Sequence, residues 1–261
     1  MVELVGLVFI GIFSGIVSGM TGASGVMVLI PILTSVFGAP LFVAIGTSLM
    51  ADVIASGPIA VLYYKARNFN VRAALFLGLG AIVGTQIGTS HVVFVPENLI
   101  MIGVSLAMIG LGIRMMRGSV RNVHIQPSWT KKITIKHDVL RSLLSLAIGL
   151  LLGIMTGFFG AGGGILVFLI LYFVFNFDLK TSIGTAAGVM LISAFAGAWG
   201  YWGLGNVDVR IGFIVGISAM IGGIASAHIA HRIDEDVLSR YVGILFTLLA
   251  IVMLAVRFLG A

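Results

Sequence analysis

Two glycine-rich segments hold the residues of this chain that are best suited to bind a ligand. One runs from Ser18 to Gly25, and a similar one follows 138 residues later, from Thr156 to Gly164. A helix that restarts after such a break presents free backbone N–H groups and the positive end of its dipole, and both attract an anion. We predict an anion-binding site between the breaks, made of small residues and hydroxyls: Ser18, Gly19, Thr21, Gly22, Ser24, Gly25, Thr156, Gly157, Gly160, Gly162, Gly163 and Gly164.

Glycine at this density also suits close helix packing or a phosphate loop. Small residues spaced four apart let helices pack closely, and Gly11, Gly15 and Gly19 have this spacing. A phosphate loop would need a Lys-Ser or Lys-Thr pair, and none follows Gly164. The run before Gly164 is also long enough to span a membrane, unlike the short buried strand that precedes a phosphate loop. We therefore keep helix packing as the alternative and set the phosphate loop aside.

Asp52 is the acidic residue that lies well inside an apolar run. A carboxylate at membrane depth is costly when ionised, and such residues commonly carry protons in transporters, so we predict that Asp52 couples transport to protons. The position 138 residues later is Met190, which limits the chain to one such site. The alternative is a protonated carboxyl that a neighbouring hydroxyl or carbonyl satisfies. Thr47, Ser48 and Thr185 are predicted to line the pathway, although such hydroxyls also bond to their own helix.

The sequence offers little for other chemistry. It contains no cysteine, which excludes disulfides and thiolate metal sites. His91, His228 and His231 lie near the ends of apolar runs without a carboxylate at ligand spacing, and we interpret them as interfacial residues rather than metal ligands. The apolar runs hold neither a histidine-rich cluster nor paired carboxylates, so we predict no enzyme activity and no cofactor.

Composition indicates a membrane protein. Apolar residues make up 59% and charged residues 9% of the sequence, with a mean hydropathy of +1.19, which leaves too little polar surface for a water-soluble globule. A helix needs ~20 apolar residues to cross the bilayer. The apolar runs occupy 3–37, 40–64, 72–94, 98–116, 139–176, 179–202, 209–230 and 237–259. The formal net charge is +6, but basic residues lie mainly in loops, which argues against a nucleic-acid partner.

The chain is one membrane unit present twice. From Gly11 to about Arg114, each position aligns without a gap with the position 138 residues later. For example, Ile45-Gly46-Thr47 corresponds to Ile183-Gly184-Thr185. We predict a first repeat at 1–117, a cytoplasmic linker at 118–138 and a second repeat at 139–261. A duplicated hydrophobic bundle with a break at the same place in each copy is typical of secondary transporters.

The first apolar run sets the predicted topology. Residues 3–37 make 35 positions, too many for one span and too few for two. Two half-helices that fold back as a re-entrant hairpin would leave three transmembrane helices in each repeat and invert the copies. Two half-helices that continue across the membrane would make four spans in each repeat and leave the copies parallel. Segment length favours the inverted arrangement, within an all-α polytopic membrane protein.

Charge and aromatic residues orient the predicted spans. Lys65, Arg67 and Arg72 follow the second run, and an excess of such residues marks a cytoplasmic loop. Four aromatic residues fall at the ends of spans, where we expect belts at the membrane surface: Tyr63, Tyr64, Tyr201 and Trp202.

The order of these motifs resembles the sulfite exporter TauE/SafE family of membrane permeases. The resemblance rests on Gly157-Phe-Phe-Gly160-Ala-Gly162-Gly163-Gly164, on Ile183-Gly184-Thr185, and on Asn206-Val207-Asp208-Val209-Arg210. It implies a bacterial or archaeal cytoplasmic-membrane permease for small sulfur-containing anions such as sulfite, sulfoacetate or thiosulfate, driven by the proton gradient. A small-anion channel without proton coupling is the alternative. The first copy departs from the motif, with Ser24 and Val26 where the second has Gly162 and Gly164.

Overall fold

The computed structural model describes residues 2–91, 138–159 and 163–259, together with 106, 109–110, 112–113 and 116. Throughout these ranges the chain forms helices joined by short connections, without a strand, which confirms the predicted all-α class. The predicted run 98–116 and the linker 118–138 fall almost entirely outside the described residues, as do Gly160 and Gly162. The proposed repeat boundaries therefore stay a prediction.

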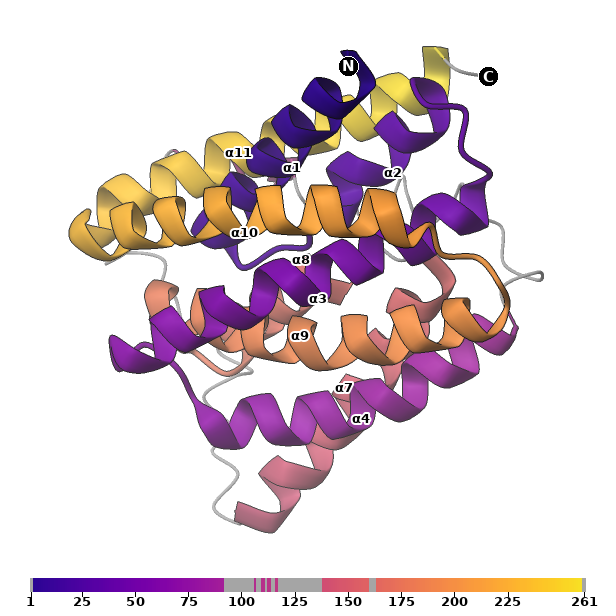
Figure 1. Cartoon of the computed structure of the whole chain (residues 1–261). Helices are drawn as coiled ribbons and strands as arrows, with labels where there is room; N and C mark the ends of the chain where they lie inside the picture. The colour runs from indigo at the N-terminus through magenta and orange to yellow at the C-terminus, as the bar shows by residue number, and fades with distance from the viewer. Residues whose placement is uncertain are drawn as a thin grey trace.

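Within each described range, the helices follow one another with short links (Figure 1). They are α1 (Val2–Thr21), α2 (Val26–Ser35), α3 (Leu41–Lys65), α4 (Val71–Ser90), α7 (Asp138–Phe159), α8 (Gly163–Leu169), the π-helical η3 (Ile170–Val174), α9 (Leu179–Gly203), α10 (Val209–Arg232) and α11 (Glu235–Leu259). Five of them, α1, α3, α4, α9 and α10, are long and apolar enough to cross a membrane. The protein is accordingly a multi-pass membrane protein.

Six helices pack in the order α1, α10, α3, α9, α4 and α7, with α3 and α9 at the centre (Figure 1). The contacts of their glycines show whether neighbouring helices run parallel or antiparallel. Gly11 faces Val215 and Gly15 faces Ala219, so α1 and α10 run parallel. The contacts Gly80–Leu146 and Gly84–Leu150 show in the same way that α4 runs parallel to α7. The contacts Gly212–Met50 and Gly216–Ile54 show that α10 runs parallel to α3. The contacts Gly46–Tyr201 and Gly184–Tyr63 show that α3 runs antiparallel to α9.

Glycine is required where these helices touch. A Cβ on Gly84 would lie 2.8 Å from the backbone nitrogen of Ile154, and one on Gly11 would lie 2.7 Å from the carbonyl oxygen of Val215. Both distances are far below ordinary van der Waals contact, so backbone meets backbone at these positions. The structure confirms the packing interpretation for Gly11 and Gly15, and small residues at an interface are how membrane helices associate without a hydrophobic driving force.

Gly84→Ala should therefore destabilise the folded protein. Overpacking of this kind costs about 1–3 kcal/mol, because backbone must move to admit the methyl group. Gly57→Ala is the matched control, since its Cβ would lie 3.6 Å from the nearest atom, a methyl carbon of Leu191. Thermal unfolding in detergent should show a Tm several degrees lower for Gly84→Ala and an unchanged or higher Tm for Gly57→Ala. Equal Tm values for the two variants would contradict the assigned packing.

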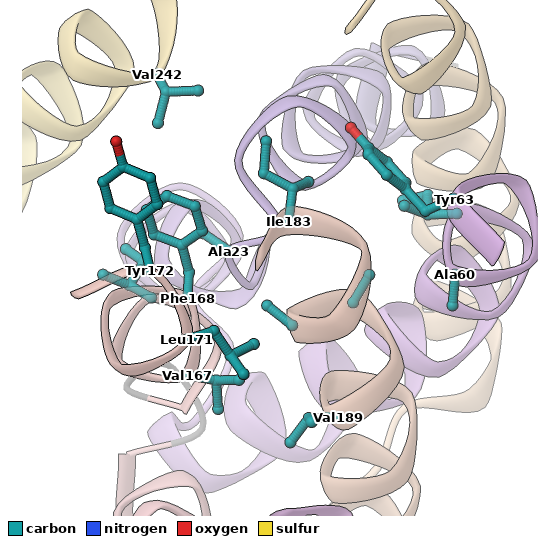
Figure 2. Packing of buried hydrophobic residues seen from close by; sticks show 14 of the residues in the cluster. Ala23, Ala60, Tyr63, Val167, Phe168, Leu171, Tyr172, Ile183, Val189 and Val242 are labelled. Atoms are coloured by element: carbon teal, nitrogen blue, oxygen red, sulfur yellow. The ribbon is translucent and has the colours of Figure 1, made fainter. Parts of the chain in front are cut away.

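The first break packs into the second half of the chain. Ala23 belongs to one buried cluster with Phe168 and Leu171, and the same cluster includes Ile183 near the start of α9 (Figure 2). Since α8, η3 and α9 supply these neighbours, residues distant in sequence hold the break together with its own helices α1 and α2.

Candidate functional site

The first break turns at Gly22. α1 ends at Thr21 and α2 begins at Val26. Between them Gly22 has a φ of 64°, in the left-handed region that favours glycine. A Cβ on Gly22 would also lie 2.5 Å from the carbonyl oxygen of Ile183. The backbone conformation therefore favours glycine at this position, and the close approach to α9 requires it.

The hydroxyls of the break bind its own backbone. The Thr21 hydroxyl donates to the carbonyl oxygen of Val17 at 2.7 Å and accepts from the backbone N–H of Ala23 at 3.0 Å. The Ser24 hydroxyl accepts from the backbone N–H of Val26 at 3.1 Å. Both side chains are buried. The break is thus pre-organised, with its polar groups fixed in an interior away from water.

Asp52 reaches this break from α3. Asp52 is 3% exposed, and its carboxyl accepts hydrogen bonds from the Ser24 hydroxyl and from the backbone N–H of Gly25. Its own carbonyl oxygen accepts from the Ser56 hydroxyl at 2.5 Å. The carboxyl therefore occupies donors at the start of α2, which is where the sequence predicted an anion. Asp52 and Ser24 are both predicted site residues, but the sequence gives no sign of their contact.

The second break touches the first. α7 ends at Phe159 and α8 begins at Gly163. A Cβ on Gly164 would lie 2.5 Å from the backbone nitrogen of Ser24, and Gly164 also faces the sulfur of Met190. The counterpart of Asp52 thus lies beside the second break, as Asp52 lies beside the first. The structure brings the described parts of both breaks together.

Three further predicted site residues, Thr156, Thr47 and Thr185, make hydrogen bonds with backbone groups. The Thr156 hydroxyl donates to the carbonyl oxygen of Leu152 at 2.9 Å. Thr47 accepts from the backbone N–H of Asp208 at 2.8 Å, and Thr185 accepts from that of Asn70 at 3.0 Å. Thr47 thus binds the segment before α10 to α3, and Thr185 binds the segment before α4 to α9. Their role in lining a pathway stays a prediction.

Ser48 is one helical turn before Asp52, on the same face of α3. Its hydroxyl is buried and has no hydrogen-bond partner among the described residues. Ser18 is also buried, and its carbonyl oxygen accepts from the backbone N–H of Gly22 at 2.8 Å. Both residues lie close in sequence to the groups that shape the first break.

The predicted aromatic belts are wrong for two of the four residues. Tyr63 and Tyr201 are fully buried, and their hydroxyls donate to the carbonyl oxygens of Gly19 at 2.9 Å and Gly157 at 3.1 Å. They therefore hold the last turn before each break instead of meeting the membrane surface. The sequence signal for their burial is that the same residue, tyrosine, recurs at the 138-residue offset. The neighbouring pair, Tyr64 and Trp202, differs between the copies, and both of these residues are exposed.

The three predicted interfacial histidines differ in burial. His91 and His228 are exposed, in keeping with an interfacial position. His231 packs on Tyr63 with ring centroids 4.3 Å apart, and its Nδ1 lies 3.3 Å from the side-chain nitrogen of Asn68. Within residues 2–91, 138–159 and 163–259, no three His, Cys, Asp or Glu side chains gather as a metal site would require.

Comparison with known proteins places the chain in a family. The profile of the sulfite exporter TauE/SafE family matches residues 7–253. The probable membrane transporter protein YdhB of Bacillus subtilis is 25% identical over 219 residues, which cover 84% of this chain and 85% of that protein. A probable membrane transporter protein of Methanocaldococcus jannaschii is 25% identical over 256 residues, covering 92% and 90%. One of Xylella fastidiosa is 30% identical over 178 residues, covering 66% and 64%.

No solved structure matches the chain significantly. The family match nevertheless extends over both helix breaks, over α3, α4, α9 and α10, and over α1 from residue 7 onward. Relatives in bacteria and an archaeon match across most of their own length. The protein belongs to the sulfite exporter TauE/SafE family of membrane transporters.

Proposed function

We propose that this protein is a secondary transporter of small sulfur-containing anions, of the sulfite, sulfoacetate or thiosulfate class, in the cytoplasmic membrane of a bacterium or archaeon. The observation that carries the proposal is the contact between the two helix breaks at Ser24 and Gly164, beside the buried Asp52. Irregular backbone at membrane depth is tolerated where it is enclosed by protein or lines a cavity. The name of the family supports the class of anion.

Backbone groups and small hydroxyls would hold the anion. Gly22 and Gly164 bring backbone close to backbone, and Ser24 supplies a buried hydroxyl donor that now binds Asp52. None of these residues carries a charge, and an anion bound by dipoles can leave more readily than one paired with lysine or arginine. That weak, neutral binding suits a transporter, which must release its substrate on the far side.

The two halves of the chain form inverted repeats in this proposal. α3 and α9 are counterparts at the 138-residue offset, and they run antiparallel. The contact of Tyr63 with Gly19 recurs as Tyr201 with Gly157. Inverted repeats of this kind are common in transporters, where they exchange conformations to open the site to either side.

In this proposal the chain turns back at the first break, although α1, with 20 residues, is long enough for a full span and is not the predicted half-helix. α1 and α3 both run parallel to α10, so the chain must reverse direction between them. That reversal falls to α2, whose 10 residues are about half of a membrane span. The hairpin of α1 and α2 accordingly places the break inside the bundle.

Asp52 would couple the anion to a proton. An ionised Asp52 carboxyl holds the Ser24 hydroxyl and the Gly25 N–H, which are donors that an anion at this break would also use. Two negative groups at one set of donors repel each other, so the anion binds more readily when Asp52 is protonated. Substrate and proton would thus be carried together.

A flux screen in proteoliposomes tests the proposal. Sulfite, sulfoacetate, thiosulfate, sulfate and taurine are offered with and without an imposed pH gradient, and empty liposomes provide the background. We expect saturable flux of at least one of the first three anions, accelerated by the gradient. Flux that rises linearly with concentration and ignores the gradient would identify the channel alternative instead. Absence of flux for all five compounds would overturn the substrate class.

A further inference from the structure

A groove runs between α4 and α9, which lie side by side (Figure 1). Its volume is about 590 Å³, and its lining includes Ile82, Gln86, Leu191, Phe195 and Trp199. Two of these side chains stand out from the surface, since Phe195 is 60% and Trp199 is 70% exposed. Because α4 and α9 are both long and apolar enough to cross a membrane, the groove faces either lipid or another membrane protein.

Two polar groups in this groove lack a hydrogen-bond partner within the described residues. Gln86 donates through Nε2 to the carbonyl oxygen of Ala196 at 2.7 Å, which leaves its Oε1 as an acceptor without a donor. The indole N–H of Trp199 is a donor without an acceptor. At ~1.5 Å per residue, Ala196 lies ~10 Å before the end of α9 at Gly203. The groove therefore reaches from the membrane surface into the apolar layer.

The equivalent surface in the other half of the chain, between α10 and α3, is apolar at these positions. At the 138-residue offset, Gln86 corresponds to Ile224 and Trp199 corresponds to Val61. Lipid tails solvate isoleucine and valine well but offer no hydrogen bond to an amide oxygen or an indole N–H. Polar side chains on membrane helices therefore commonly pair across a helix–helix interface. Of the two equivalent surfaces, the α4–α9 surface is the one with groups that need such a partner.

The described neighbours of α4 and α9 pack elsewhere. Gly80 and Gly84 of α4 face α7, and neither residue lines the groove. Gly112, a described residue of the run 98–116, packs on α11, because a Cβ there would lie 2.6 Å from the carbonyl oxygen of Gly243. No described residue of α11 lines the groove. Within the described residues, the chain therefore leaves the groove uncovered.

We propose that this groove is the interface of a symmetric homodimer in the membrane. In a two-fold arrangement a surface meets itself, so every contact occurs twice. Gln86 Oε1 of one copy accepts from the Trp199 N–H of the second copy, and symmetry forms the reverse pair. Because one surface carries both the acceptor and the donor, a second copy of this chain satisfies both groups. The exposed rings of Phe195 and Trp199 fill the groove of the opposite copy, as aromatic side chains commonly do at protein interfaces.

Cysteine cross-linking tests the interface, because the chain has no cysteine of its own. Ile82→Cys and Phe195→Cys place a thiol in the groove, and Val61→Cys places one on the equivalent surface of the other half, where Val61 is 51% exposed. In proteoliposomes with a large excess of lipid, a short bismaleimide should join the two groove variants into dimers and leave Val61→Cys monomeric. Equal cross-linking of all three variants would indicate random collision and overturn the proposal. Absence of dimers from both groove variants would also overturn it.

Substitution of the polar pair tests the two hydrogen bonds. Gln86→Leu removes the acceptor, and Trp199→Phe removes the donor while keeping a ring. Each change breaks both symmetric bonds, so the dimer should dissociate roughly tenfold more readily, and the double variant should lose little more than either single variant. Trp202→Phe is the control, since Trp202 is 56% exposed but does not line the groove, and it should dimerise as the wild type does.

Energy transfer between labelled copies, at decreasing ratios of protein to lipid, measures the dimer affinity of each variant. Unchanged Tm values in detergent verify folding. Gln86→Leu also loses the bond to the Ala196 carbonyl, whereas Trp199→Phe removes no hydrogen bond within the described residues, so Trp199→Phe decides if Gln86→Leu is unstable. Wild-type affinity in Trp199→Phe would overturn the pairing. A wild-type protein that stays monomeric at every ratio would overturn the dimer and leave lipid as the occupant of the groove.

Discussion

Gly22→Val should abolish anion transport while leaving membrane insertion intact. Gly22 has a φ of 64°, a conformation that costs a residue with a side chain about 1–2 kcal/mol and that a β-branched residue adopts least readily. Its Cβ would also lie 2.5 Å from the carbonyl oxygen of Ile183, so the break and α9 could not approach as they do. Anion flux into proteoliposomes, normalised to the amount of inserted protein, measures the loss.

Gly38→Val is the matched control for that variant. Gly38 has the same φ of 64°, but a Cβ there would meet nothing within 4 Å. It therefore carries the conformational cost without the collision, and we expect near-normal flux. Equal loss in both variants would trace the effect to backbone strain, and wild-type flux in Gly22→Val would mean that the anion passes elsewhere.

Asp52→Asn should retain anion binding but lose the acceleration of flux by a pH gradient. The amide oxygen can still accept from the Ser24 hydroxyl and the Gly25 N–H, so the break keeps its shape. The amide exchanges no proton and carries no charge, so it neither repels the anion nor couples it to protons. Flux with and without an imposed gradient, together with binding at several pH values, measures the change.

Asp178→Asn is the control for the loss of a carboxyl. Asp178 is exposed just before α9, and its side chain makes no capping hydrogen bond. This variant should respond to the gradient as the wild type does. A normal response from Asp52→Asn would make that carboxyl structural, and the proton would then enter through another group or with a protonated substrate.

Local sequence was sufficient for the helices and for the breaks between them. Hydropathy reports how well a segment dissolves in lipid, and glycine density reports where backbone can reverse, so neither depends on distant neighbours. The break after Thr21 and the restart at Val26 lie where the glycines of the first motif predicted them. Asp52 could likewise be identified as a candidate from the sequence, because the free-energy cost of a carboxylate depends on the apolar run around it.

Contacts between distant residues depended on the tertiary structure. Tyr63 stands at the end of a span, where its position alone favours the membrane surface, yet it is buried because its hydroxyl reaches the carbonyl oxygen of Gly19. Ser24 meets Asp52 across 28 residues and meets Gly164 across the whole linker. Which faces of two helices meet depends on their direction and register. Direction and register depend on where glycines let two backbones approach each other, so they cannot be predicted from a single segment of the sequence.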